Sequence, residues 1–167
     1  MDNLNPVLNE TISWQMFGDL CNDLALKICK DFKPDMIVGI VKAGVLPGAV
    51  IASLFQKDFY TIKLSRKQDE KIVHARPILF VPISHSVYGK KVLVVDEIAI
   101  SGETLQMAKQ EVLDKQASEV KTCSLFVKPD GFKPDWYAYE SSKKIVCPWN
   151  VNIIENENLT ANPAYTG

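Results

Sequence analysis

The sequence predicts an α/β fold in which a parallel sheet is covered by helices on both faces. Three observations support this prediction. Apolar runs of strand length alternate with helical patterns, and some of these runs are apolar throughout, as in strands buried on both faces. The chain has 167 residues, 47% of them hydrophobic, which is typical of one compact domain. In sheets of this kind, ligands bind beyond the carboxyl ends of the strands.

Two helices and two strands are predicted in the first part of the chain. Apolar residues three or four positions apart predict an amphipathic helix over 11–31, with Ser13 as its N-cap. The run 36–41 is continuous and β-branched, which indicates a buried strand. A helix over 45–55 follows, and alternating apolar and polar residues then predict a strand over 59–64.

The middle of the chain combines a polar segment with the clearest strand. Residues 65–76 are charged and have no period, so they are interpreted as a mobile surface loop. A short strand over 78–83 contains Pro82 and follows Pro77, which favours a position at the sheet edge. The apolar run 92–95 predicts a fully buried strand.

The last part of the chain is predicted to add one helix and three strands. Apolar spacing predicts a helix over 103–117, and a buried strand over 120–128 follows. The aromatic-rich segments 136–139 and 144–149 are interpreted as a strand pair outside the main sheet.

Charge and cysteine content exclude several classes of function. Nineteen basic and twenty acidic residues give a net charge of −1, so no global positive field would hold nucleic acid or an anionic membrane. Four separated cysteines without a Cys-x-x-Cys pair argue against a zinc site or a disulfide framework. The chain starts without a basic and apolar leader, and we therefore expect a cytoplasmic protein without nucleic-acid or membrane partners.

Two adjacent carboxylates, Asp96 and Glu97, follow the apolar run 92–95. Holding two such groups together is costly unless a cation or hydroxyl donors satisfy them, which indicates the edge of a ligand site. The next turn, 98–104, contains a glycine and two hydroxyl groups and leads into a helix. Several backbone N–H groups can therefore converge on one anion, such as a phosphate, if the Glu103 side chain turns outward.

The turn taken alone has a second interpretation. It is equally consistent with a simple connection between a strand and a helix, in which Ser101 or Thr104 is the N-cap.

Taken together, these features resemble the motif of type I phosphoribosyltransferases that binds phosphoribosyl pyrophosphate (PRPP). That motif is an apolar strand, two acidic residues, a three-residue spacer, Thr or Ser, Gly, any residue, and Thr or Ser. The resemblance implies that Asp96 and Glu97 act as catalytic residues that hold the ribose hydroxyls. It also implies a 5′-phosphate loop that consists of Ala99, Ile100, Ser101, Gly102, Glu103 and Thr104.

A second block, 38–47, is similar to the pyrophosphate loop of this family, which has a basic residue followed by two glycines. The resemblance assigns this loop to Lys42, Ala43 and Gly44, where Ala43 departs from the family pattern. The family often has a non-proline cis peptide in this loop, and the sequence leaves its occurrence here open.

A third block covers 126–129, 134–137 and 145–149 and is similar to the hood of xanthine-guanine and archaeal hypoxanthine phosphoribosyltransferases. The resemblance implies that Lys128 contacts the exocyclic oxygen of a purine and that the main chain at Ile145 meets the base edge.

The likeness covers nearly the whole chain. We therefore expect a single phosphoribosyltransferase domain over 1–167, with a core at about 10–128 and a small C-terminal hood at about 129–155 that includes the N-terminal segment.

Two departures concern the base. Enzymes for 6-oxopurines usually have an aspartate near purine N7 where this chain has Ile100, so an acid–base contribution cannot come from that position. The base-binding position that usually carries a stacking aromatic side chain holds Lys144. Adenine and orotate phosphoribosyltransferases manage without the aspartate, and the change is therefore also consistent with another base.

The resemblance implies a Mg²⁺-dependent transferase that makes a nucleoside 5′-monophosphate and pyrophosphate from PRPP and a base, most simply hypoxanthine, guanine or xanthine in purine salvage. Mg²⁺ would be held mainly by PRPP, with Asp96 and Glu97 as further candidate ligands. The segment 65–76 is a candidate lid in which Arg66 and Lys67 would contact phosphate, although a plain solvated loop is equally consistent with its composition.

Two other functions stay open on the sequence. One is a phosphoribosyltransferase for another base such as adenine, and the other is a regulator that senses PRPP or a nucleotide without catalysis. The family resemblance also implies a homodimer or homotetramer.

Overall fold

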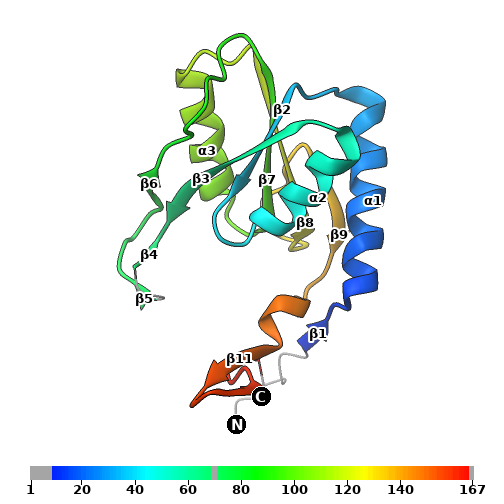
Figure 1. Ribbon diagram of the computed structural model, residues 1–167, viewed down its shortest axis with the longest axis vertical. Coiled ribbons are helices and arrows are strands. Elements are labelled where there is room, and N and C mark those ends of the chain that lie inside the picture. The colour runs from blue at the N-terminus through cyan, green and yellow to red at the C-terminus, as the bar shows by residue number, and fades with distance from the viewer. Residues whose placement is uncertain (1–8, 69–70, 166–167) are drawn as a thin grey trace.

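A six-stranded sheet forms the centre of the computed structural model, which describes residues 9–68 and 71–165. The strand order is β6-β3-β2-β7-β8-β9 (Figure 1). The bounds are β2 Met36–Ile40, β3 Asp58–Ser65, β6 Ile78–Val81, β7 Lys91–Ala99, β8 Glu119–Val127 and β9 Trp136–Glu140. All neighbours are parallel except β6, which runs antiparallel to β3 at one edge. The predicted α/β fold is confirmed.

Helices cover both faces of this sheet. Helices α1 (Trp14–Asp31) and α2 (Val45–Phe55) pack on one face, and α3 (Glu103–Asp114) packs on the other (Figure 1). Leu93 and Val95 of β7 contribute to the cluster under α1 and α2, whereas Val92 and Val94 contribute to the cluster under α3. Because both faces are covered, every residue of β2 is buried, which explains its uniformly apolar sequence.

Ser13 is the N-cap of α1, as predicted, and its Oγ accepts a hydrogen bond of 3.1 Å from the amide of Met16. We expect Ser13→Ala to lower the free energy of unfolding by about 1 kcal/mol, because that amide loses its partner. Ser53→Ala in α2 is the matched control, since the Ser53 hydroxyl only bonds to the Ala49 carbonyl of its own helix. Denaturant unfolding measures both variants, and equal stabilities would contradict the capping role.

The prediction of an aromatic strand pair outside the main sheet is wrong for its first member. Strand β9 joins the main sheet parallel to β8, because its aromatic side chains find apolar partners there: Trp136 packs against Phe32 at 5.9 Å and Tyr139 against Phe126 at 6.4 Å between ring centroids. Only β10 (Lys144–Val146) lies outside the sheet, where it pairs in parallel with β1 (Asn9–Thr11).

The chain then forms the short helix η1 (Pro148–Asn150) and the antiparallel hairpin of β11 (Asn152–Glu155) and β12 (Asn158–Ala161). These elements lie beyond one end of the sheet (Figure 1). Within the described residues, no helix is long and apolar enough to cross a membrane.

The segment predicted as a mobile loop over 65–76 contains regular structure. Strands β4 (Lys67–Gln68) and β5 (Lys71–Ile72) form a small antiparallel hairpin. The carbonyl of Arg66 accepts hydrogen bonds from the amides of Val73 and His74 at 3.0 and 3.1 Å, which closes the base of this hairpin. This hairpin is held by backbone hydrogen bonds and does not need a periodic pattern of apolar residues. The sequence pattern therefore could not predict it.

Candidate functional site

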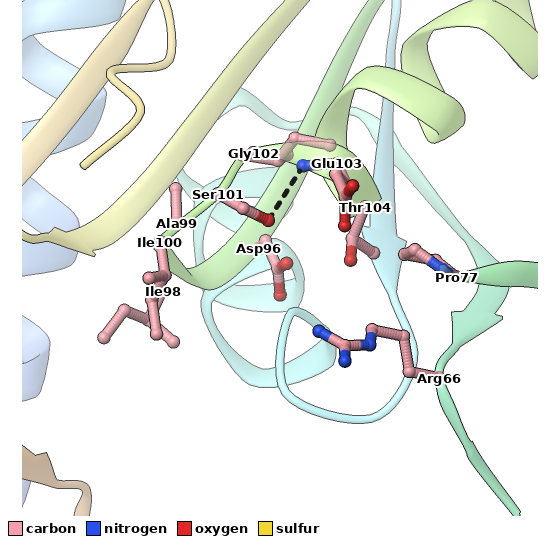
Figure 2. Close-up of a pocket in the computed structure, with 11 residues that line it drawn as sticks. Arg66, Pro77, Asp96, Ile98, Ala99, Ile100, Ser101, Gly102, Glu103 and Thr104 are labelled. Carbon is pink, nitrogen blue, oxygen red and sulfur yellow. Dashed lines mark hydrogen bonds between the residues drawn. The ribbon is translucent and has the colours of Figure 1, made fainter. Parts of the chain in front are cut away.

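A cavity of about 300 Å³ lies at the carboxyl end of β7 (Figure 2). It brings together most of the side chains that the sequence pattern singled out around the acidic pair. The lining residues are Arg66, Pro77, Asp96, Ile98, Ala99, Ile100, Ser101, Gly102, Glu103, Thr104 and Leu105. The whole predicted 5′-phosphate loop therefore faces the same cavity as one of the two carboxylates and one predicted lid residue.

Gly102 shapes the loop and caps α3. Its φ of 77° lies in the left-handed region, and a Cβ at this position would lie 2.2 Å from the ring of Phe132. The amide of Phe132 also donates to the Ile100 carbonyl at 2.8 Å. The alternative in which Ser101 or Thr104 is the N-cap is wrong, because the chain turns into the helix at the glycine, which has no side chain to cap it.

The loop presents the features of an anion site. The first amides of α3 have no acceptor within the helix, and the helix dipole places partial positive charge at the same point. Ser101 Oγ accepts from the amide of Glu103 at 3.4 Å, and the guanidinium of Arg66 lines the cavity (Figure 2). Glu103 is half-buried and also lines the cavity, so the expected outward turn of this residue is not complete.

Asp96 is the carboxylate of the cavity. Its Oδ1 accepts a hydrogen bond of 2.8 Å from the amide of Glu97. Burial raises the pKa of Asp96 to about 7, and the neighbouring charge of Glu97 adds to the increase, whereas the amide hydrogen bond opposes it. A carboxyl group that titrates near neutral pH at a cavity is typical of functional sites.

Glu97 faces away from this cavity, because neighbouring residues of a strand point to opposite sides. It is only 8% exposed, and its Oε1 accepts a hydrogen bond of 2.8 Å from the thiol of Cys147. The Trp149 side chain also interacts with this carboxylate and, like Cys147, lowers its pKa. Burial has the larger effect, and the pKa of Glu97 is raised. The structure thus separates the acidic pair that the sequence pattern treated as one unit.

The predicted pyrophosphate loop lies beside the end of β7 without lining the cavity. The peptide bond between Val41 and Lys42 is cis. A Cβ on Gly44 would lie 2.3 Å from the carbonyl oxygen of Val95, the residue before Asp96. The loop of Lys42, Ala43 and Gly44 therefore packs against the strand that carries the cavity carboxylate.

The three predicted base-binding residues do not line the cavity either. The amine of Lys128 donates to the Ser142 carbonyl at 3.3 Å. The amine of Lys144 lies 4.5 Å from the ring centroid of Tyr165. Ile145 lies in β10 and pairs with Glu10 of β1. Lys128 and Ile100 still belong to one neighbourhood, since Gly131 packs against both.

The two predicted lid residues differ. Arg66 lines the cavity, and its Nε donates to the His74 carbonyl at 3.3 Å. Lys67 lies in β4, where it pairs with Ile72, and does not line the cavity.

Four residues in the structural neighbourhood of the site were not predicted to have a role there, although two of them, Cys147 and Trp149, lie in the block assigned to the hood. Cys147 and Trp149 bind Glu97, Phe132 packs on Gly102, and Tyr165 lies over Lys144. No spacing pattern links these residues to the acidic pair, since each reaches it only through the folded chain.

Comparisons with known proteins agree with this geometry. The family profile described as "Phosphoribosyl transferase domain" matches residues 10–158. An orotate phosphoribosyltransferase of Saccharolobus solfataricus is 33% identical over 98 residues, which cover 59% of this chain and 46% of that relative. The chain therefore spans less than half the length of this relative.

Two further relatives are matched over most of their length. Xanthine phosphoribosyltransferase 1 of Saccharomyces cerevisiae is 25% identical over 195 residues, which cover 90% of this chain and 93% of the relative. The crystal structure of a purine phosphoribosyltransferase from Pyrococcus horikoshii matches with a TM-score of 0.75 and 27% identity, over 89% of this chain and 99% of that one.

Proposed function

The chain belongs to the phosphoribosyl transferase family, and from this we infer that it transfers the 5-phosphoribosyl group of PRPP to a purine base, with release of pyrophosphate. The observation that carries the proposal is the cavity that joins Asp96 to the amino end of α3. Similarity over most of the chain to a xanthine phosphoribosyltransferase and a purine phosphoribosyltransferase supports a purine as the acceptor.

The side chains of the cavity have complementary tasks in this reaction. The amides of 101–104 bind the 5′-phosphate, and Arg66 balances its negative charge. Asp96 accepts hydrogen bonds from the ribose hydroxyls and so holds the sugar at the carboxyl end of β7. A nitrogen of the base then attacks the anomeric carbon as pyrophosphate leaves, so no protein nucleophile is needed. The protein contributes position and the exclusion of water.

The side chains around the cavity that could bind a metal ion are consistent with a Mg²⁺ ion that arrives bound to PRPP. Among the residues that the structure describes, no three His, Cys, Asp or Glu side chains lie close enough to hold a metal ion alone. Mg²⁺ commonly binds through one or two carboxylates together with substrate phosphates, and Asp96, which lines the cavity, would be such a carboxylate. The ion would neutralise charge on the departing pyrophosphate.

Ile100 is the position at which base specificity can be tested. It is 59% exposed at the cavity and offers no proton partner to a purine nitrogen. We expect Ile100→Asp to raise turnover with hypoxanthine or guanine, by up to about 100-fold if the new carboxyl group takes part in proton transfer. Ile154→Asp on the β11–β12 hairpin is the control, because Ile154 is 73% exposed and outside the cavity. Unchanged rates in both variants would show that position 100 does not limit the reaction.

Pyrophosphate release from Mg²⁺-PRPP tests the proposed function directly. Hypoxanthine, guanine, xanthine, adenine, orotate and uracil are offered separately to the purified chain. Release that depends on hypoxanthine, guanine or xanthine supports the proposal. Release with adenine alone would support the second candidate, a transferase for another base, which Ile100 and Lys144 favour. Binding of PRPP without release from any base would instead indicate a sensing protein.

The same family membership supports a homodimer or homotetramer that acts in the cytoplasm on PRPP and a nucleobase. Sedimentation of the purified chain with and without PRPP measures the assembly.

A further inference from the structure

A half-buried tyrosine, Tyr165, lies near the acidic pair and outside the hydrophobic core. Burial raises the pKa of its phenol, and the nearby charge of Glu97 adds to the increase, so the phenol is close to the carboxyl end of β7. The Tyr165 ring belongs to neither of the two hydrophobic clusters that the described residues form. An aromatic side chain in this position is available to a ligand.

Other aromatic side chains near this end of β7 are already packed. The ring of Phe132 fills the space above Gly102. The Trp149 ring packs edge-on against Phe17 of α1, at 5.1 Å between ring centroids. Among the described residues, no pair of stacked or edge-on rings includes Tyr165. Tyr165 therefore differs from these residues, because its ring has a face that no other aromatic side chain covers.

Hydrogen bonds hold Tyr165 in place although it lies outside the main sheet. Its carbonyl accepts from Nδ2 of Asn9 at 2.8 Å, and its amide donates to the Asn162 carbonyl at 3.0 Å. Asn162 is itself fixed, because its Nδ2 donates to the Asn150 carbonyl of η1 at 2.9 Å. A ring that is fixed before a ligand arrives loses little conformational freedom on binding.

Lys144 of β10 lies over one face of the Tyr165 ring. Its amine is 4.5 Å from the ring centroid and also donates to the Ala164 carbonyl. The attraction between the ammonium group and the ring fixes the orientation of the ring. Because Lys144 occupies one face, a planar ligand would stack on the opposite face.

We propose that Tyr165 forms a stacking wall of the base site and that Asn162 positions it there. The proposal rests on the proposed function, which places the base beside Lys144 and Ile145 of β10. The base is joined to the sugar that Asp96 holds, so it must lie close to the carboxyl end of β7. A purine is a planar aromatic ring system, and it gains affinity when it stacks on a fixed aromatic side chain.

Equilibrium binding separates contact with the base from contact with the sugar phosphate. The purified chain is titrated in a calorimeter with guanosine, inosine and xanthosine 5′-monophosphate, and with ribose 5-phosphate, which lacks the base. We expect Tyr165→Leu to raise Kd for the tightest of the three nucleotides about tenfold, and to keep Kd for ribose 5-phosphate within about twofold, because only the stacked ring is lost. Tyr165→Phe keeps the ring and should bind the nucleotide with a Kd within about threefold of the original.

Two matched controls exclude a general effect of these substitutions. Tyr88 is 70% exposed, and Tyr88→Leu should leave every Kd unchanged. The Asn158 side chain donates to the Asn156 carbonyl within the β11–β12 hairpin, and Asn158→Ala should also have no effect. Asn162→Ala should weaken nucleotide binding and spare ribose 5-phosphate, as Tyr165→Leu does, because the ring is then no longer held in position. Unchanged nucleotide binding in this variant would overturn the role of Asn162.

The two ligands also distinguish the ways in which the proposal can fail. Equal nucleotide affinities of the original chain and Tyr165→Leu would overturn it. Tighter nucleotide binding by Tyr165→Leu would overturn it as well, since the ring would then cover the base site instead of supporting the base. If the original chain binds neither ribose 5-phosphate nor any of the nucleotides, the proposed function fails, and the role of Tyr165 fails with it.

Discussion

Replacement of Asp96 by Asn should reduce kcat/KM for PRPP by about 100-fold or more while leaving the fold intact. Asp96 is the carboxylate that lines the cavity, and an amide cannot accept the same pair of hydrogen bonds from ribose hydroxyls or neutralise a cation. Pyrophosphate release at varied PRPP concentration measures the effect. Asp23→Asn, on the exposed surface of α1, is the control and should retain full activity. Normal turnover by the Asp96 variant would contradict the assignment of this cavity.

The same variant should stabilise the protein in the absence of PRPP and metal. Burial raises the pKa of Asp96 from an unfolded value near 3.8 to about 7, so the folded chain keeps a proton that the unfolded chain has lost. The free energy of unfolding contributed by this group therefore falls as the pH rises from about 4 to about 7. It stays low above pH 7, where both states are ionised.

Asn does not titrate, so the variant should not lose stability as the pH rises from about 4 to about 7. The difference in free energy of unfolding between the variant and the original chain should grow across this pH range. It should reach about 1–4 kcal/mol at pH 8, since each unit of pKa shift corresponds to about 1.4 kcal/mol. Urea unfolding in EDTA at pH 4, 6 and 8 measures it. A constant difference at the three pH values would show that the folded-state pKa of Asp96 is not raised.

The second large effect is expected for Gly44→Ala. A Cβ at residue 44 would lie 2.3 Å from the carbonyl oxygen of Val95 and 2.8 Å from the amide nitrogen of Ile40. Both are backbone atoms, which cannot move aside like the end of a flexible side chain. We expect a loss of about 3 kcal/mol or more in the free energy of unfolding, at the upper end of overpacking effects. The displaced strand also carries Asp96, and we expect PRPP binding to weaken as well.

Gly18→Ala provides the matched control for this substitution. A Cβ on Gly18 would meet no atom within 4 Å, and the residue lies inside α1. Alanine at this position should raise the free energy of unfolding by about 0.5–1 kcal/mol, because it loses less backbone entropy on folding than glycine. Denaturant unfolding of both variants measures the contrast. Similar stabilities would mean that the 41–44 loop can move away from β7 at little cost.

Local patterns were enough to predict most elements and the phosphate loop. The 3.6-residue period predicted α1 and α3, and uniformly apolar runs identified β2 and the first half of β7 because such strands are buried on both faces. The loop of 99–104 could be recognised because a strand, a glycine turn and a helix lie next to each other in the chain. Strand β9 was predicted outside the main sheet, because aromatic residues in a short segment do not indicate whether they pack under α1 or outside the sheet.

The sequence by itself determined which backbone groups can form an anion site and which strand ends beside them, because these features depend on residues within about one turn of each other. Only the tertiary structure decided that Asp96 lines the cavity and that Glu97 does not. Strand pairing placed Asp96 at the cavity, and the return of the chain near residue 147 brought a thiol and an indole to Glu97. Contacts between residues 50 positions apart depend on how the elements pack, and no local period records them.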